Sequence, residues 1–195
     1  MSQLAADGGL LRRAWAWYAA TAALAVLSVA GCLALPHPAS LRRSLLAWVE
    51  GARYLDEAGI IHQRTRNDCG VACIRMTVSM LARRLDERGL PVVESEKGVS
   101  IADVSVSLRR EGVDSEPWSV AYDRLGCVPS ASILHLGSQH FVVLESADDG
   151  VIVRDPELGR LRFAAADFRP MWDGKAIVVF AEAGVRSRFA ACMRR

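Results

Sequence analysis

Four residues of this chain have the types and spacing needed for nucleophilic catalysis: Gln63, Cys69, His140 and Asp155. Cys69 ends a polar loop and opens an apolar segment whose hydrophobic residues recur every three or four positions, which predicts a helix. A thiol at a helix N-terminus meets unsatisfied backbone N–H groups and the positive end of the helix dipole, and both favour the thiolate. Taken alone, a cysteine near a helix start is usually a small buried apolar residue, so a base and an orienting group must be found elsewhere.

The base and the orienting acid are predicted at the ends of two neighbouring strands. His140 begins an apolar run, Asp155 ends the next one, and the sequence between them, 148–150, is Asp-Asp-Gly, a hairpin-turn signature. In such a hairpin the two side chains meet, and Asp155 accepts one imidazole N–H while the other ring nitrogen takes a proton from Cys69. Gln63, six residues before Cys69, can add its amide to the Cys69 backbone N–H as an oxyanion hole.

Nearby polar residues receive structural interpretations. Asp68 is expected to cap the helix that Cys69 opens. Cys73, one helical turn later, is expected to pack in the core, as His135 is in the core or at the sheet edge. His62 is expected in a surface loop, although it adjoins Gln63.

The remaining cysteines and the charge balance exclude several classes of protein. Five cysteines, an odd number at irregular spacing, argue against a disulfide framework, and Cys127 and Cys192 show no partner. No Cys-x-x-Cys pair suggests zinc or a redox dithiol. Because 24 basic residues face 22 acidic ones, there is no electrostatic case for a nucleic-acid partner.

Residues 1–36 are predicted to be a membrane anchor or signal segment. Residues 14–35 carry no charge, and Arg12 and Arg13 precede them. A spanning helix needs about 20 apolar residues. Cys32 lies in a sequence that resembles a lipoprotein cleavage box, so lipidation there is an alternative to an uncleaved anchor. Basic residues flank both ends of the apolar run, and the positive-inside rule gives no decisive orientation.

The rest of the chain predicts a linker and helix over 37–59, a main domain over 60–182 and a frayed basic tail over 183–195. Ser40 is expected to cap a helix over 41–58, and Ser100 with Asp103 forms a capping-box pattern for a second helix ending near Gly112. Expected strands follow over 118–122, 131–136, 140–144, 151–156, 161–163 and 176–180, with a short helix or turn over 164–168. Helices first and antiparallel strands second predict an α+β fold.

The same residues resemble a known family. Gln63, the Asp-Cys-Gly-Val-Ala-Cys sequence 68–73, the run 129–135, the run 140–144, Asp-Pro at 155–156 and the ending 168–174 occur in the order found in bacteriocin-processing cysteine peptidases. These papain-like enzymes cut leader peptides after a double glycine and are usually fused to an ABC transporter. The resemblance implies that Cys69 is the nucleophile, His140 the base, Asp155 the orienting acid and Gln63 the oxyanion donor, with no metal or nucleotide cofactor.

We therefore expect a stand-alone, membrane-anchored cysteine endopeptidase that cleaves leader or precursor peptides, with Gly-Gly before the cut and a separate export system as a partner. The alternatives are a non-catalytic leader-peptide-binding module, an acyl transferase or amidase on the same scaffold, and a membrane-tethered assembly protein. Arg12 and Arg13 favour a catalytic domain on the periplasmic side of a bacterial inner membrane. The cytosolic location of the domain in most members of the family, and the need for a free thiol, favour the cytosol. Of the two, we expect the periplasmic side.

Overall fold

The structure, a computed structural model, describes residues 39–86, 90, 98–137 and 139–195. Contacts divide the chain into two units, Met1–Arg42 and Arg43–Arg195, and the second unit carries the sheet and all four candidate residues. The predicted membrane segment 14–35, with Cys32, lies outside the described residues. Among the residues that are described, no helix is both long and apolar enough to cross a membrane.

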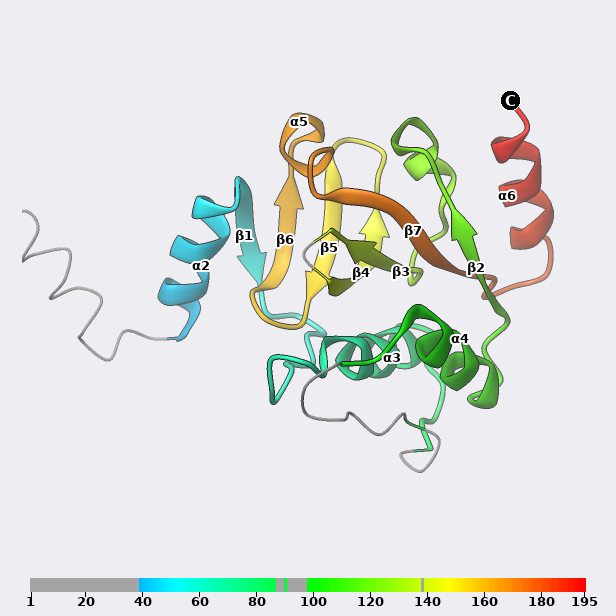
Figure 1. The fold of residues 1–195 in the computed structure, drawn as a ribbon, viewed down its shortest axis with the longest axis horizontal. Helices are drawn as coiled ribbons and strands as arrows, with labels where there is room; N and C mark the ends of the chain where they lie inside the picture. Colours follow the sequence, from blue (N-terminus) through cyan, green and yellow to red (C-terminus); the bar gives the residue numbers. More distant parts are fainter. Residues whose placement is uncertain (1–38, 87–89, 91–97, 138) are drawn as a thin grey trace, which may run out of the picture. The chain divides into compact units, whose positions relative to one another are not determined.

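The described residues contain a seven-stranded antiparallel sheet with helices around it (Figure 1). The strand order is β1-β6-β5-β4-β3-β7-β2. The strands are β1 (Ala52–Asp56), β2 (Ser115–Ser119), β3 (Ile133–Leu136), β4 (His140–Ser146), β5 (Val151–Asp155), β6 (Gly159–Phe163) and β7 (Trp172–Val179). The helices are α2 (Ala39–Val49), α3 (Cys69–Met80), α4 (Ile101–Arg110), α5 (Ala165–Phe168), α6 (Val185–Met193) and the 3₁₀ helix η2 (Tyr122–Cys127). The architecture confirms the predicted α+β class.

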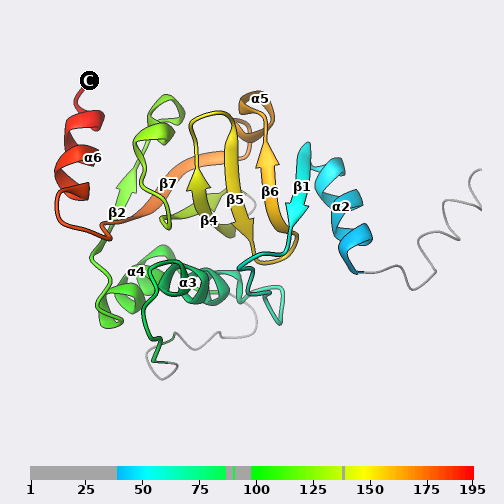
Figure 2. The ribbon, with the colours of Figure 1, turned by 180° about the vertical axis from the view of Figure 1, so that it is seen from behind.

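The sheet separates two hydrophobic cores, and β4 contributes to both. Phe141 and Val143 point into the core that α3 and α4 share with the sheet, whereas Val142 and Leu144 point into the core on the opposite face. This alternation is the period-2 pattern of a strand buried on both faces. Figure 2, seen from behind, shows α3 and α4 lying together along one side of the sheet.

Helix α3 is seated tightly at its N-terminus, which is where the chemistry is predicted. A Cβ atom on Gly70 would lie 2.3 Å from Val99 Cγ2, so only glycine allows this approach to the segment before α4. That segment leads into the predicted capping box: Ser100 Oγ accepts the Asp103 N–H at 3.2 Å, and Asp103 Oδ2 accepts the Ser100 N–H at 2.9 Å. The start of α3 is therefore packed against the start of α4.

The predicted helix over 41–58 is wrong beyond Val49. Gly51 has a φ of 75°, in the left-handed region that ends a helix, and residues 52–56 form β1 at the edge of the sheet. Tyr54 pairs with Leu161 of β6, so these residues gain a strand partner that helical periodicity alone does not reveal. The strand expected over 118–122 is likewise displaced: β2 ends at Ser119, and Tyr122 begins η2.

The C-terminal tail is not frayed, and the expectation that Cys127 and Cys192 lack a partner is wrong. Residues 185–193 form α6, and Cys192 on this helix is joined to Cys127 at the end of η2 by a disulfide, with Cα atoms 5.7 Å apart. Phe189, also on α6, is 2% exposed and packs edge-to-face on Trp118 with ring centroids 4.9 Å apart. The buried Phe189 ring and the disulfide stabilise this helix, although the basic composition of the segment predicts a frayed tail.

Candidate active site

Cys69 is the first residue of α3, and its buried side chain lines a cavity. The loop before it is closed by Asp68, whose carboxylate accepts the backbone N–H groups of Arg64 and Thr65, each at 3.0 Å. Asp68 makes no side-chain cap to α3, so its predicted capping role is wrong. The carboxylate instead shapes the loop that delivers Cys69, and the positive end of the α3 dipole favours a negative charge on the sulfur.

His140 and Asp155 lie side by side, as the positions of the two residues in the predicted hairpin indicate. His140 begins β4, Asp155 ends β5, and His140 Nε2 lies 2.9 Å from Asp155 Oδ2. Burial of the imidazole lowers the His140 pKa, but hydrogen bonds to Asp155 and to Cys69, with the charges of both groups, outweigh burial and raise this pKa to about 10. The neighbouring aspartate and cysteine therefore favour the charged, imidazolium form of His140.

The Asp155 carboxylate is fixed at both oxygens. While Oδ2 faces His140, Oδ1 accepts the backbone N–H groups of Glu157 at 2.7 Å and Leu158 at 3.0 Å. The side chain is 6% exposed. These bonds come from the tight turn that Pro156 starts after β5, so the turn orients the carboxylate and the carboxylate orients the imidazole.

Gln63 lies next to this turn. Its backbone N–H donates to the Pro156 carbonyl at 3.0 Å, and His62 Nδ1 lies 3.0 Å from the same oxygen. The Gln63 Oε1 atom is buried and has no hydrogen-bond partner among the described residues. Gln63 does not line the cavity that contains Cys69; it lines an adjoining hollow with Pro156 and Glu157. The structure thus brings three predicted site residues into one cavity and anchors the fourth beside them.

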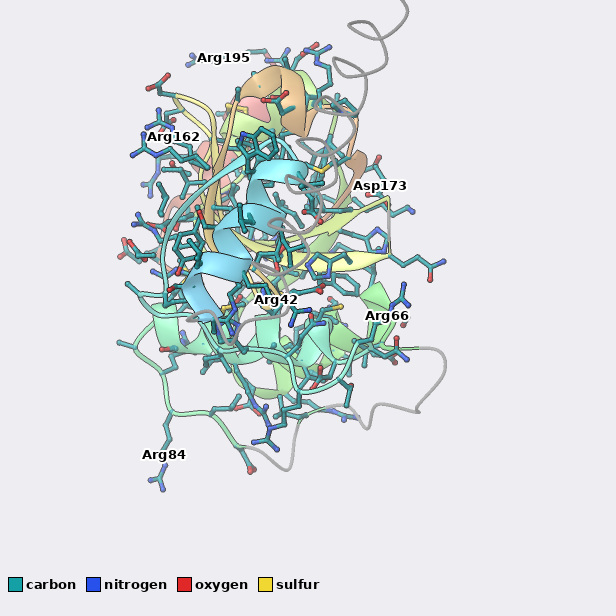
Figure 3. All side chains as sticks on the ribbon, turned by 90° about the vertical axis from the view of Figure 1, so that its left-hand side faces the viewer. Arg42, Arg66, Arg84, Arg162, Asp173 and Arg195 are labelled. Carbon is teal, nitrogen blue, oxygen red and sulfur yellow. A yellow bond between two sulfur atoms is a disulfide. The ribbon has the colours of Figure 1, made fainter. Side chains whose placement is uncertain are left out.

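The cavity has a volume of about 1080 Å³ and runs from the α3 N-terminus across the ends of the central strands. Its walls come from the start of α4, the β3–β4 hairpin and the end of β5, with Lys175 of β7 and Met171 before it. Arg66 also lines it; Figure 3 shows Arg66 and Asp173 on the same side of the molecule, one near α3 and the other on the sheet. A peptide-sized ligand could be held between the two layers.

His135 contributes to this cavity, which the sequence alone did not reveal. Its Nδ1 lies 2.5 Å from Asp173 Oδ2, its ring packs edge-on against Phe141 with centroids 5.0 Å apart, and Lys175 Nζ reaches the same aspartate oxygen at 3.0 Å. The available signal was that His135 lies opposite Phe141, next to His140, in a short hairpin. His62 is half-buried rather than simply a surface residue, with Nε2 2.8 Å from Glu57 Oε2.

Cys73 takes the packing role predicted for it. The side chain is fully buried in the core between α3 and the sheet, and in the described part of the chain Cys69 and Cys73 are the free thiols. Burial, and then the neighbouring Cys69 and Asp155, raise the Cys73 pKa well above its ordinary value. Of these two thiols, only Cys69 lines the cavity.

The family model described as "Peptidase C39 family" matches residues 57–184. The chain belongs to the peptidase C39 family. By that membership it is a cysteine-type peptidase, and the matched range includes all four candidate residues.

Two relatives illustrate the similarity. A probable microcin secretion/processing ATP-binding protein of Escherichia coli is 27% identical over 131 residues, which are 66% of this chain and 19% of that protein. A probable functional amyloid protease of Pseudomonas aeruginosa, FapD, is 26% identical over 150 residues, which are 70% of this chain and 65% of that protein. The chain therefore spans about a fifth of the first relative and just under two thirds of the second.

Two solved structures of peptidase domains have a similar fold. The chain matches a double glycine motif protease from an AMS/PCAT transporter, solved with its leader peptide, with a TM-score of 0.55 at 19% identity over 62% of this chain and 89% of that one. The peptidase domain of Streptococcus ComA, a bi-functional ABC transporter, gives a TM-score of 0.53 at 19% identity over 62% of this chain and 96% of the other. These matches establish the papain-like α+β fold.

Proposed function

We propose that the chain is a cysteine endopeptidase in which Cys69 is the nucleophile, His140 the proton carrier, Asp155 the orienting acid and Gln63 an oxyanion donor. The observation that carries the proposal is the position of His140, which lies 2.9 Å from the Asp155 carboxylate and lines the same cavity as Cys69. A nucleophile, a base and an orienting group in one line form the arrangement that activates a thiol.

The proposed reaction begins from the thiolate–imidazolium pair. The Cys69 sulfur attacks the scissile carbonyl carbon, and the carbonyl oxygen takes the negative charge. His140 then gives its proton to the leaving amine nitrogen as the C–N bond breaks, which leaves a thioester on Cys69. In the second half, His140 takes a proton from water, the hydroxide attacks the thioester, and the C–S bond breaks to restore the thiolate–imidazolium pair.

Gln63 is proposed to stabilise the oxyanion together with the Cys69 backbone N–H. Support comes from the anchoring of Gln63 on the Pro156 carbonyl, directly after Asp155, because this bond ties the loop before α3 to the end of β5.

The proposed substrate is a leader or precursor peptide with Gly-Gly before the cleaved bond. Similar proteins support this substrate class: they include a double glycine motif protease solved with a leader peptide, a secretion/processing protein and a probable functional amyloid protease. We further propose that a separate export system moves the product and that residues 14–35 tether the chain to a bacterial inner membrane, since they carry no charge.

Cleavage of a synthetic precursor by the purified full chain tests the proposal. Wild type should release a fragment ending in Gly-Gly, Cys69→Ala and His140→Ala should release none, and Cys73→Ala is the matched thiol control that should retain cleavage. Binding of the precursor by wild type without any cleavage would favour the peptide-binding module. Transfer of the acyl group to an added amine in preference to water would favour the acyl transferase.

A further inference from the structure

The disulfide between Cys127 and Cys192 has no place in the proposed mechanism. Neither cysteine lines the cavity, and the two are 65 residues apart in the sequence. Cys127 is the last residue of η2, which precedes β3, and Cys192 lies in the final turn of α6. The bond therefore fastens the C-terminal helix to the middle of the domain.

The packing around α6 brings the two cysteines together in the folded chain. Phe189 is buried between Trp118 and Phe180, with ring centroids at 4.9 Å and 5.8 Å. Arg186 pairs with Glu116 of β2 at 2.6 Å and with Asp114 at 2.7 Å. Apolar burial and two ion pairs thus dock α6 against the sheet in a position that places Cys192 beside Cys127.

The four described cysteines differ in access to an oxidant. Cys127 and Cys192 are half-buried at the surface, whereas Cys69 is 5% exposed and Cys73 is fully buried. Thiol–disulfide exchange with an oxidising protein needs in-line approach of that protein's sulfur, which the half-buried outer pair allows. Cys73 is closed off in the core, and Cys69 is reached only by molecules that enter the cavity. A protein oxidant therefore reaches the pair that fastens α6, whereas Cys69 in the cavity and Cys73 in the core are screened from a partner of that size.

We propose that Cys127–Cys192 is formed in the cell by a dithiol-oxidising protein, and that the domain over 43–195 therefore works in an oxidising compartment. In the reaction, the thiolate of one cysteine attacks the disulfide of the oxidising protein and forms a mixed disulfide. The thiolate of the other then attacks the mixed disulfide, which releases the oxidising protein as a dithiol. Two thiols of this chain lose two protons and two electrons, and one disulfide of the partner gains them.

The disulfide indicates an oxidising compartment because the redox environment decides whether such a bond persists. Stable disulfides persist outside the cytosol, in the periplasm of bacteria or at the cell surface, and are rare where thiols are kept reduced. A peptidase domain placed there meets precursors that have already crossed the membrane. The encounter with exported precursors rests on the proposed function, whereas the assignment of the compartment rests on the disulfide alone.

The test is to map the thiols of the full chain inside cells. The chain is expressed in a bacterium with an intact exported dithiol-oxidation system and in a matched strain lacking it, cells are quenched in acid, and free thiols are blocked with N-ethylmaleimide under denaturing conditions. Trypsin should then yield residues 189–194 linked to residues 125–154 from the first strain, and both peptides as blocked thiols from the second. Cys69 and Cys73 should be blocked in both strains.

Free thiols at Cys127 and Cys192 in the first strain would overturn the inference. A linked peptide found only when the acid quench is omitted would overturn it too, because the bond would then form in air after lysis. As a second readout, trypsin added to spheroplasts should digest the domain, and protection of the domain until lysis would contradict the compartment. Cys69→Ala should give the same peptide map, so loss of peptidase activity and loss of the disulfide are separate outcomes.

Discussion

The Gln63 backbone N–H donates to the Pro156 carbonyl at 3.0 Å, so the residue proposed to hold the oxyanion is bonded to the residue that follows the proposed orienting acid. The contact joins two segments about 90 residues apart, the loop before α3 and the turn after β5. Because Asp155 in the same turn holds His140 at 2.9 Å, one turn sets the positions of both the imidazole and Gln63. Catalytic groups from the two layers of the fold are thereby placed relative to one another.

The first prediction concerns the Gln63 side chain. Gln63→Ala should lower kcat about 10²- to 10³-fold, because one donor to the transition-state oxyanion is lost, while KM changes little. Steady-state kinetics on the precursor peptide measure both constants, and circular dichroism checks that the fold is kept. A change confined to KM would show that Gln63 binds the ground-state peptide and is not an oxyanion donor.

The second prediction is the alkaline limit of activity. Because the His140 pKa is raised to about 10, the imidazolium that donates to the leaving amine is lost only as pH rises toward 10, and kcat/KM should fall there. The same raised pKa stabilises the folded chain fully below the unfolded value near 6.5, and this contribution is lost as pH rises through about 10. Measurement of kcat/KM and of the free energy of unfolding between pH 6 and pH 11 tests both, and an activity loss centred near pH 7 would contradict the charged imidazole.

The third prediction separates the two ends of the Asp155 carboxylate. Asp155→Asn keeps the shape but offers one acceptor oxygen where the structure uses two, one toward His140 and one toward the backbone N–H groups of Glu157 and Leu158. Either the His140 imidazole or the backbone N–H groups of the turn then lose their acceptor, because the amide NH₂ can only donate. We expect kcat/KM to fall at least tenfold, and the alkaline limit to move to lower pH because the negative charge that raises the His140 pKa is gone. An unchanged pH profile would argue against Asp155 as the partner of the imidazole.

The fourth prediction concerns the C-terminal helix. The double variant Cys127→Ala, Cys192→Ala should lower the free energy of unfolding by about 2 to 4 kcal/mol, because the bond closes a long loop in the unfolded chain. Cleavage of the precursor well below the unfolding temperature should be unchanged, since neither cysteine lines the cavity. Chemical denaturation with and without a reductant provides the measurement, and equal stabilities would show that α6 is held by Phe189 and Arg186 alone.

The placement of His140 and Asp155 could be predicted from sequence because it depends only on the lengths of two consecutive strands and of the turn between them. One strand starts with the histidine, the next ends with the aspartate, and a short Asp-Asp-Gly turn joins them, so their meeting needs no knowledge of the rest of the fold. The start of α3 at Cys69 was likewise readable, because a polar loop gives way to an apolar helical period at that residue.

Other features depend on contacts between distant segments and could not be read in this way. The strand β1 exists because the edge of β6 offers it hydrogen bonds, while its own sequence also suits a helix. The disulfide depends on how Phe189 docks α6, because this packing brings Cys192 to Cys127, 65 residues earlier in the sequence. The sequence also does not decide the role of Asp68, because a carboxylate before a helix can accept hydrogen bonds from the loop behind it as well as from the helix ahead, and here it accepts those of the loop.

The most direct test of the proposed mechanism is the rate at which a thiol electrophile labels each cysteine of the full chain across pH. If His140 activates Cys69, Cys69 should react fast below the pH range of an ordinary thiol, Cys73 should stay unlabelled in the folded chain, and His140→Ala should abolish the fast reaction. If Cys69 instead reacts no faster than an ordinary exposed thiol, and His140→Ala changes nothing, the thiolate–imidazolium pair does not exist and the catalytic account is wrong.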